Sequence, residues 1–278
     1  MLDSVVWRWA AEYAPFPVLG RGGECELMKI RLPIVAALAL TACSIMTSPA
    51  AAQGVPYACP VSPTYFTANN GLAHTRAALK SGRIVILATG SSSIEGAGAS
   101  ARNLGYVPML QGALQRRFPG VAITLINRGI GGETMRETVA RLEQDVALAQ
   151  PDLVIWQLGT NDVLRDRPSA DMLAEFQAAR AILDSAQTDV VLIDPQRLPE
   201  TTSHAALKDR NPALGAVATT VDQWASQSGY AVLHRFEAMR GWSGINTGGV
   251  GPDDLHLNDF GYACWAEITA EGLSGALR

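Results

Sequence analysis

The chain has 278 residues, of which 48% are hydrophobic and 17% are charged. A chain of this length and composition can bury a sizeable core, and it lacks the low hydrophobicity and high charge of disordered proteins. The formal net charge is −4, and no run of basic residues occurs. This composition argues against a nucleic-acid partner.

The first fifty residues resemble an export signal rather than part of a folded core. A short basic segment, Met28–Arg31, precedes an apolar segment, Ile34–Ala42, which is too short for a permanent membrane span. We predict a signal peptide over residues 28–52. Because signal peptides have short basic n-regions, residues 1–27 are predicted to be a mis-assigned extension.

Two cleavage sites are compatible with this signal. The small residues Ala50–Ala52 predict cleavage before Gln53, which gives a periplasmic or secreted protein. The segment Leu40–Cys43 also resembles a bacterial lipobox, in which Cys43 becomes lipidated and anchors the chain. Membrane association is expected only in this second case.

Removal or modification of the signal leaves Cys59 and Cys264 as an even pair in a chain that is expected to reach an oxidising compartment. A disulfide between them and two separate thiols both fit the sequence. No Cys/His spacing resembles a zinc site, and no long acidic cluster suggests another metal. We therefore expect neither a metal nor a cofactor.

From about residue 69 the chain alternates between short apolar runs and longer segments with helical spacing. This alternation predicts one domain over 69–278, an α/β/α sandwich of three layers with a five-stranded parallel sheet, preceded by a Pro-rich arm over 53–68. The apolar runs are Ile84–Leu87, Val121–Ile126, Leu153–Trp156, Val190–Ile193 and Ala231–Leu233. The predicted helices cover 104–117, 134–149, 169–186, 212–228 and 258–277.

Polar residues follow these predicted strands, where open α/β sheets bind ligands. They include a serine-rich turn, Gly90–Ser93, a glycine-rich loop, Asn127–Thr134, and the segment Gly159–Asp162. Asp253 and His256 precede the last helix in an Asp-x-x-His spacing. Together these residue types supply a nucleophile, oxyanion donors, and a base with a carboxylate to orient it.

In this respect the chain resembles the SGNH hydrolase (GDSL esterase/lipase) family, as a bacterial exported member. All four signature blocks of that family occur in order: Gly90-Ser91-Ser92 with Gly96, then Gly132, then Gly159–Asp162, then Asp253 with His256. The resemblance implies the SGNH variant of the flavodoxin-like fold. Ser91 stands where the family usually has aspartate, which affects the shape and polarity of the turn more than the reaction class.

The resemblance also implies a role for each site residue. Ser92 is the expected nucleophile, His256 the general base and acid, and Asp253 the carboxylate that fixes the imidazole tautomer. The oxyanion hole is expected from the Ser92 and Gly132 backbone amides and the Asn161 side chain. Asp254 competes with Asp253 for its role, and the spacing favours Asp253. Taken singly, each residue also fits a cap or a turn.

The implied reaction is hydrolysis of a carboxylic ester or thioester of a small molecule, glycan or lipid. Two alternatives are an acyltransferase to a sugar or peptidoglycan hydroxyl, and a non-catalytic phosphate- or flavin-binding module. The glycine-rich segment 241–252 is predicted to border the acyl pocket. Asp194 and Gln196 line the pocket or form a structural turn. The remaining polar candidates, His74, His204 and His234, are predicted to be structural or exposed, and Trp156 to lie in the core.

Overall fold

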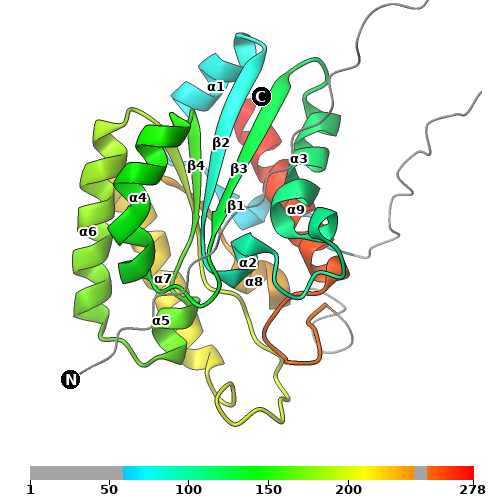
Figure 1. The fold of residues 1–278 in the computed structure, drawn as a ribbon, viewed down its shortest axis with the longest axis vertical. Helices are drawn as coiled ribbons and strands as arrows, with labels where there is room; N and C mark the ends of the chain where they lie inside the picture. Colours follow the sequence, from blue (N-terminus) through cyan, green and yellow to red (C-terminus); the bar gives the residue numbers. More distant parts are fainter. Residues whose placement is uncertain (1–58, 241–248) are drawn as a thin grey trace, which may run out of the picture. The chain divides into compact units, whose positions relative to one another are not determined.

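The computed structural model describes residues 59–240 and 249–278 (Figure 1). The predictions of the extension, the signal peptide, its cleavage sites and a lipidated Cys43 lie outside the described residues. So does most of the glycine-rich segment 241–252.

A six-stranded sheet forms the centre of the fold, in the order β1-β6-β5-β4-β2-β3. The five strands β2 to β6 pair in parallel, whereas β1 pairs with β6 in the antiparallel direction. The strands are β1 (Phe66–Thr67), β2 (Arg83–Gly90), β3 (Ala122–Gly129), β4 (Leu153–Gln157), β5 (Asp189–Ile193) and β6 (Ala231–Leu233). The five parallel strands are those predicted.

The sheet has one strand more than predicted, because β1 lies in the segment that was expected to be only a Pro-rich arm. Two residues are too few to show a period-2 pattern, so this strand has no sequence signal. β4 is buried along its whole length, as expected for a central parallel strand covered on both faces.

Helices cover both faces of the sheet, which confirms the predicted three layers (Figure 1). One face carries α1 (Ala73–Lys80), α3 (Tyr106–Arg117) and α9 (Asp259–Leu277). The other carries α4 (Met135–Ala149), α6 (Ser169–Ser185) and α7 (Asn211–Ser228). The short helices α2 (Ser92–Glu95), α5 (Thr160–Leu164) and α8 (Arg235–Arg240) follow the strands β2, β4 and β6 directly.

Each layer between sheet and helices has an aromatic cluster. On the α3/α9 face, the rings of Tyr106 and Trp265 stack with centroids 3.6 Å apart. On the opposite face Phe176 stacks on Trp224 at 4.7 Å. Trp156, on β4, is fully buried in this second cluster as predicted. The two cores fix the sheet from both sides, so the polar turns at its carboxyl edge lie on a rigid support.

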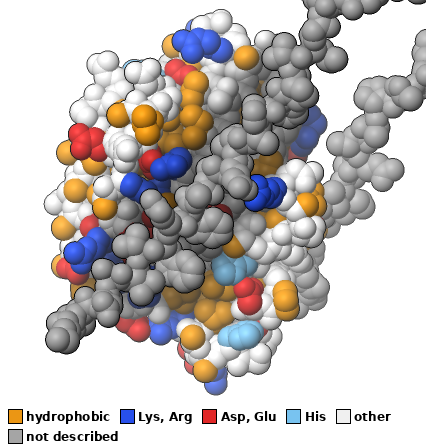
Figure 2. Space-filling model, viewed as in Figure 1, with side chains coloured by type: hydrophobic (Ala, Val, Ile, Leu, Met, Phe, Trp, Pro, Cys, Tyr) orange, Lys and Arg blue, Asp and Glu red, His pale blue; other side chains and the backbone are white. Residues whose placement is uncertain are grey.

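Three further features bear on stability and surface. A disulfide joins Cys59 to Cys264 of α9, with Cα atoms 5.6 Å apart, which resolves the cysteine alternatives in favour of a bridge. Within residues 59–240 and 249–278, no helix is both long and apolar enough to span a bilayer. On the face in Figure 2, where grey atoms leave it visible, acidic and basic side chains are interspersed.

Candidate active site

The predicted site residues come from segments that all lie at the carboxyl edge of the parallel strands (Figure 1). Ser92 begins α2 directly after β2, and Gly132 lies in the loop between β3 and α4. Asn161 lies in α5 after β4, and the segment 249–258, here called the base loop, precedes α9. The topology therefore brings together residues that are up to 164 positions apart.

Ser92, His256 and Asp253 form a continuous hydrogen-bonded row. Oγ of Ser92 lies 3.0 Å from Nε2 of His256, and Nδ1 of the same ring lies 2.6 Å from Oδ2 of Asp253. Oδ1 of Asp253 accepts the backbone N–H groups of Leu255 and His256 at 3.1 and 3.0 Å. Such a row lets the hydroxyl donate to an imidazole whose tautomer the carboxylate fixes.

The carboxylate of Asp253 is suited to remain ionised. Partial burial opposes this, but the hydrogen bonds from His256 and from two backbone N–H groups outweigh it and lower the pKa of Asp253 below its usual value. The neighbouring Asp254 instead accepts a hydrogen bond from Thr202 at 2.8 Å. The geometry thus pairs His256 with Asp253 and not with its competitor.

The turn before Ser92 requires glycine and shows how Ser91 is accommodated. Gly90 has φ +141°, and a Cβ there would lie 2.6 Å from the carbonyl oxygen of Gln157. Ser91 donates both its backbone N–H and its hydroxyl to Oε1 of Gln157, at 3.1 and 2.8 Å. A buried hydroxyl and amide therefore hold the turn where the family usually has a carboxylate.

Two backbone N–H groups at the site, those of Ser92 and Gly132, find no acceptor within the part of the chain that the structure describes. Gly132 has φ +81°, and its carbonyl accepts from the Arg165 guanidinium at 2.7 Å. Asn161 donates one amide hydrogen to the carbonyl of Glu133 at 2.8 Å, which leaves its second one available.

Largely buried ion pairs hold the Gly132 loop, and sequence reasoning did not find them. Glu133 accepts two hydrogen bonds at 3.0 Å from Nε of Arg141, whose guanidinium also pairs with Asp145. Asp162 of α5 accepts the backbone N–H of Met135 at 3.2 Å and so holds the start of α4. The i,i+4 spacing of Arg141 and Asp145 on α4 is a sequence signal for their pair, whereas no spacing rule links Glu133 or Asp162 to their partners.

Sequence reasoning missed Gly98 at the site and left the role of Gln196 open. Gly98 lies against the base loop: it has φ +90°, and a Cβ there would lie 2.5 Å from the carbonyl oxygen of Leu257 and 2.9 Å from Cβ of His256. Gln196, which the sequence left between pocket and turn, is buried and hydrogen bonds to both Ser93 and Leu255. Only the fold could reveal either contact.

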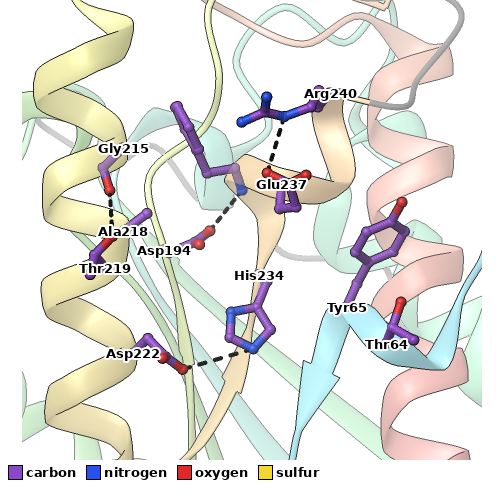
Figure 3. Close-up of a pocket in the computed structure, with 11 residues that line it drawn as sticks. Thr64, Tyr65, Asp194, Gly215, Ala218, Thr219, Asp222, His234, Glu237 and Arg240 are labelled. Carbon is purple, nitrogen blue, oxygen red and sulfur yellow. Dashed lines mark hydrogen bonds and ion pairs between the residues drawn. The ribbon is translucent and has the colours of Figure 1, made fainter.

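A separate cavity of about 480 Å³ opens beside α7, α8 and the end of β6 (Figure 3). Its lining includes Asp194, Asp222 and His234 and none of Ser92, Asp253 and His256. Burial raises the pKa of Asp194 to about 7, although it accepts the backbone N–H of Phe236. Burial likewise lowers the pKa of His234, whose Nε2 lies 3.0 Å from the Thr67 hydroxyl. Thus His234 is not part of the serine site, and Asp194 lines this cavity.

Comparison with known proteins gives the family. Residues 58–256 match the non-GDSL lipase-like family. An acetylxylan esterase from Geobacillus stearothermophilus is 42% identical over 77 residues, 27% of this chain and 35% of that protein. An arylesterase from Vibrio mimicus is 32% identical over 74 residues, 27% of this chain and 37% of that protein. The aligned segment therefore spans about a third of either relative's length.

The fold also has relatives among solved structures. A crystal structure of TesA superposes with a TM-score of 0.57 and 23% identity, over 69% of this chain and 99% of that chain. The family match covers more than half of the chain and runs from before β1 to His256. This chain therefore belongs to the non-GDSL lipase-like family of the SGNH hydrolases.

Proposed function

We propose that the protein hydrolyses carboxylic esters through an acyl-enzyme on Ser92. The observation that carries this proposal is the row Ser92–His256–Asp253, with separations of 3.0 and 2.6 Å. Beside it lie two backbone N–H groups for which residues 59–240 and 249–278 provide no acceptor. The acetylxylan esterase and the arylesterase that resemble parts of this chain support the same reaction class.

The proposed reaction has two halves. Nε2 of His256 takes the proton of Ser92 Oγ while Oγ attacks the ester carbonyl carbon, and the imidazolium then gives that proton to the departing alkoxide. In the second half the imidazole takes a proton from water as the water oxygen attacks the acyl carbon. The imidazolium then returns that proton to Oγ of Ser92 as the acyl–Oγ bond breaks, which releases the acid and restores the Ser92 hydroxyl. The ionised Asp253, whose pKa is lowered by the hydrogen bonds that it accepts, stabilises the imidazolium in both halves.

The oxyanion of each tetrahedral intermediate is proposed to lie between three donors. These are the backbone N–H groups of Ser92 and Gly132 and the second amide hydrogen of Asn161. Loss of one such donor typically lowers turnover by about 10² to 10³. Arg165 donates a hydrogen bond to the Gly132 carbonyl, and Asn161 donates one to the Glu133 carbonyl. These two bonds hold two of the three donors in place before substrate binds.

We propose that the leaving group is polar, as in esters of small alcohols or sugars. The rim beside Ser92 carries charged side chains. A Cβ on Gly131 would lie 4.0 Å from Cβ of Ser92 and 2.8 Å from Oε2 of the exposed Glu95, so this carboxylate lies near Ser92. Arg165 is half-exposed. Such a rim suits hydroxyl groups better than a long hydrocarbon chain. We also propose that the protein is exported, with mature N-terminus Gln53 or lipidated Cys43, which mass spectrometry of the mature protein distinguishes.

The test is hydrolysis of a p-nitrophenyl ester series, acetate to palmitate, and of acetylated xylo-oligosaccharides by the full chain. Ser92→Ala should abolish turnover. Ser185→Ala removes a surface hydroxyl that donates to Ile182 on α6, and it should leave turnover unchanged. A folded protein that hydrolyses none of these esters refutes the proposal. If product forms only when a sugar acceptor is added, the function is acyl transfer and not hydrolysis.

A further inference from the structure

The candidate nucleophile and base come from two separate parts of the chain, and one side chain hydrogen bonds to the neighbours of both. Gln196 follows β5 and is 1% exposed. Its Oε1 accepts from the Ser93 hydroxyl at 3.2 Å, and its Nε2 donates to the carbonyl of Leu255. Ser93 is the residue after Ser92, and Leu255 is the residue before His256.

We propose that Gln196 is a positioning residue that sets the distance between Ser92 and His256; this inference rests on the proposed function. It acts through Ser93 on the nucleophile side and through Leu255 on the base side. Gln196 itself does not touch the reacting atoms.

The base loop needs such a support because little regular structure holds it. Its own backbone pairing consists of one bridge between Val250 and Leu257 and three hydrogen bonds. These run from Gly251 N–H to the His256 carbonyl at 2.7 Å, from Asp254 N–H to the Gly251 carbonyl at 3.0 Å and from Asn258 N–H to the Gly249 carbonyl at 3.3 Å. The side chain of Asp253 is 47% exposed. Catalytic groups function only when they are held within about 0.5 Å of the productive geometry. A loop fixed by its own contacts alone would not ensure this.

Gln196 is itself anchored on the rigid part of the domain. Its backbone N–H points to the Thr160 hydroxyl on α5 at 3.4 Å. Two residues later, Leu198 exchanges hydrogen bonds with the Asn211 side chain at 2.9 and 3.0 Å, which ties this connection to the start of α7. The position of the base loop therefore follows that of the sheet and α7.

Glutamine matches the two neighbours chemically. The Ser93 hydroxyl needs an acceptor and the Leu255 carbonyl needs a donor, and a primary amide supplies one of each. Leucine in place of glutamine removes the partner of the buried Ser93 hydroxyl and of the partly buried Leu255 carbonyl, and asparagine is one methylene too short to reach both. A glutamate would place a second acceptor against the Leu255 carbonyl.

The experiment compares the full-length parent with Gln196→Leu, Gln196→Asn and Gln111→Leu. Gln111 is the matched control, because its Nε2 donates to the Ile123 carbonyl at 3.1 Å between α3 and β3, away from the site. The readouts are kcat and KM for p-nitrophenyl acetate, the rate of Ser92 labelling by a fluorophosphonate, and the low-field proton resonance of the His256–Asp253 hydrogen bond.

We expect both Gln196 variants to lose about 10- to 100-fold in kcat and in labelling rate, with KM within about twofold. Their low-field resonance should weaken or shift, whereas Gln111→Leu should match the parent in all three readouts. Gln196→Asn keeps a buried amide, so it provides the answer if Gln196→Leu does not fold.

Three results would overturn the inference. A folded Gln196 variant with parental kcat and resonance shows that the side chain does not set this geometry. An effect on KM alone makes Gln196 a substrate contact, and an equal loss in Gln111→Leu makes the effect one of general stability. In all three cases the parent is active; a parent that neither hydrolyses esters nor reacts with the probe instead refutes the proposed function.

Discussion

Gly98 allows a quantitative test of how closely the base loop is held. A Cβ at this position would lie 2.5 Å from the carbonyl oxygen of Leu257, and ordinary contact begins at 3.4 Å. Gly98→Ala must therefore displace that carbonyl, or α2 and its following turn, by about 0.9 Å. A displacement of this size passed on to His256 would lengthen its 3.0 Å separation from Ser92 beyond hydrogen-bond range.

The expected cost has two parts that can be measured separately. The left-handed φ of +90° is unfavourable for alanine by roughly 1–2 kcal/mol of folding free energy. The displacement of the base lowers kcat by about 10²-fold, because a misplacement of about 1 Å in a catalytic group typically costs that much. The assays are kcat for p-nitrophenyl acetate and the free energy of unfolding in urea.

Gly82→Ala is the matched control. Gly82 has φ +82°, and nothing lies within 4 Å of a Cβ there. It should lose the same roughly 1–2 kcal/mol of stability and keep parental kcat. The reasoning is refuted if Gly98→Ala retains kcat within about threefold of Gly82→Ala.

Three further predictions concern the Asp253–His256 hydrogen bond, the buried Asp194 and the disulfide. Asp253→Asn keeps an acceptor for Leu255 and His256 N–H but presents an amide to Nδ1, so steady-state kcat should fall about 10³- to 10⁴-fold with the fold intact by circular dichroism. The pKa of Asp194 is raised from 3.8 to about 7, so the unfolded chain loses this proton first as pH rises, and parental stability should fall between about pH 4 and 7. Asp194→Asn lacks this pH dependence. The free energy of unfolding in urea of the variant, relative to that of the parent, should therefore be higher at pH 8 than at pH 4 by up to about 4 kcal/mol. Replacing Cys59 and Cys264 by serine opens a link between residues 205 positions apart and should lower the free energy of unfolding by up to about 5 kcal/mol, and an unchanged urea midpoint would contradict this.

Local pattern predicted the parallel sheet and its helices well, because each of the five parallel strands is a short apolar run bounded by turn residues. The row Ser92, Asp253 and His256 was also found from the sequence, through the spacing within each motif and the topology that joins them. The structure confirms the predicted sheet and layers, and the family match confirms the resemblance, whereas the roles of the three residues stay predictions.

Much of the support of the site could not be predicted, because contacts such as Ser93–Gln196 and Gly98–Leu257 join elements that are distant in the sequence. In the sequence Gly98 is one of several glycines in a predicted turn, and only the structure shows that its backbone approaches Leu257 closely. Glu133 and Arg141 look like charges on an amphipathic helix and its preceding loop, yet they form a largely buried pair. β1 was missed for another reason, since two residues carry no period.

The short strand β1 has a consequence for the behaviour of the protein in solution. Without it, the parallel sheet would end at β6 with a row of free N–H and C=O groups, which is a template for the strand of another molecule. β1 occupies that edge, and the disulfide seven residues before it attaches the same segment to α9. Because the site lies across the sheet, around β2, β3 and β4, loss of the bridge is expected to promote self-association while monomers remain active.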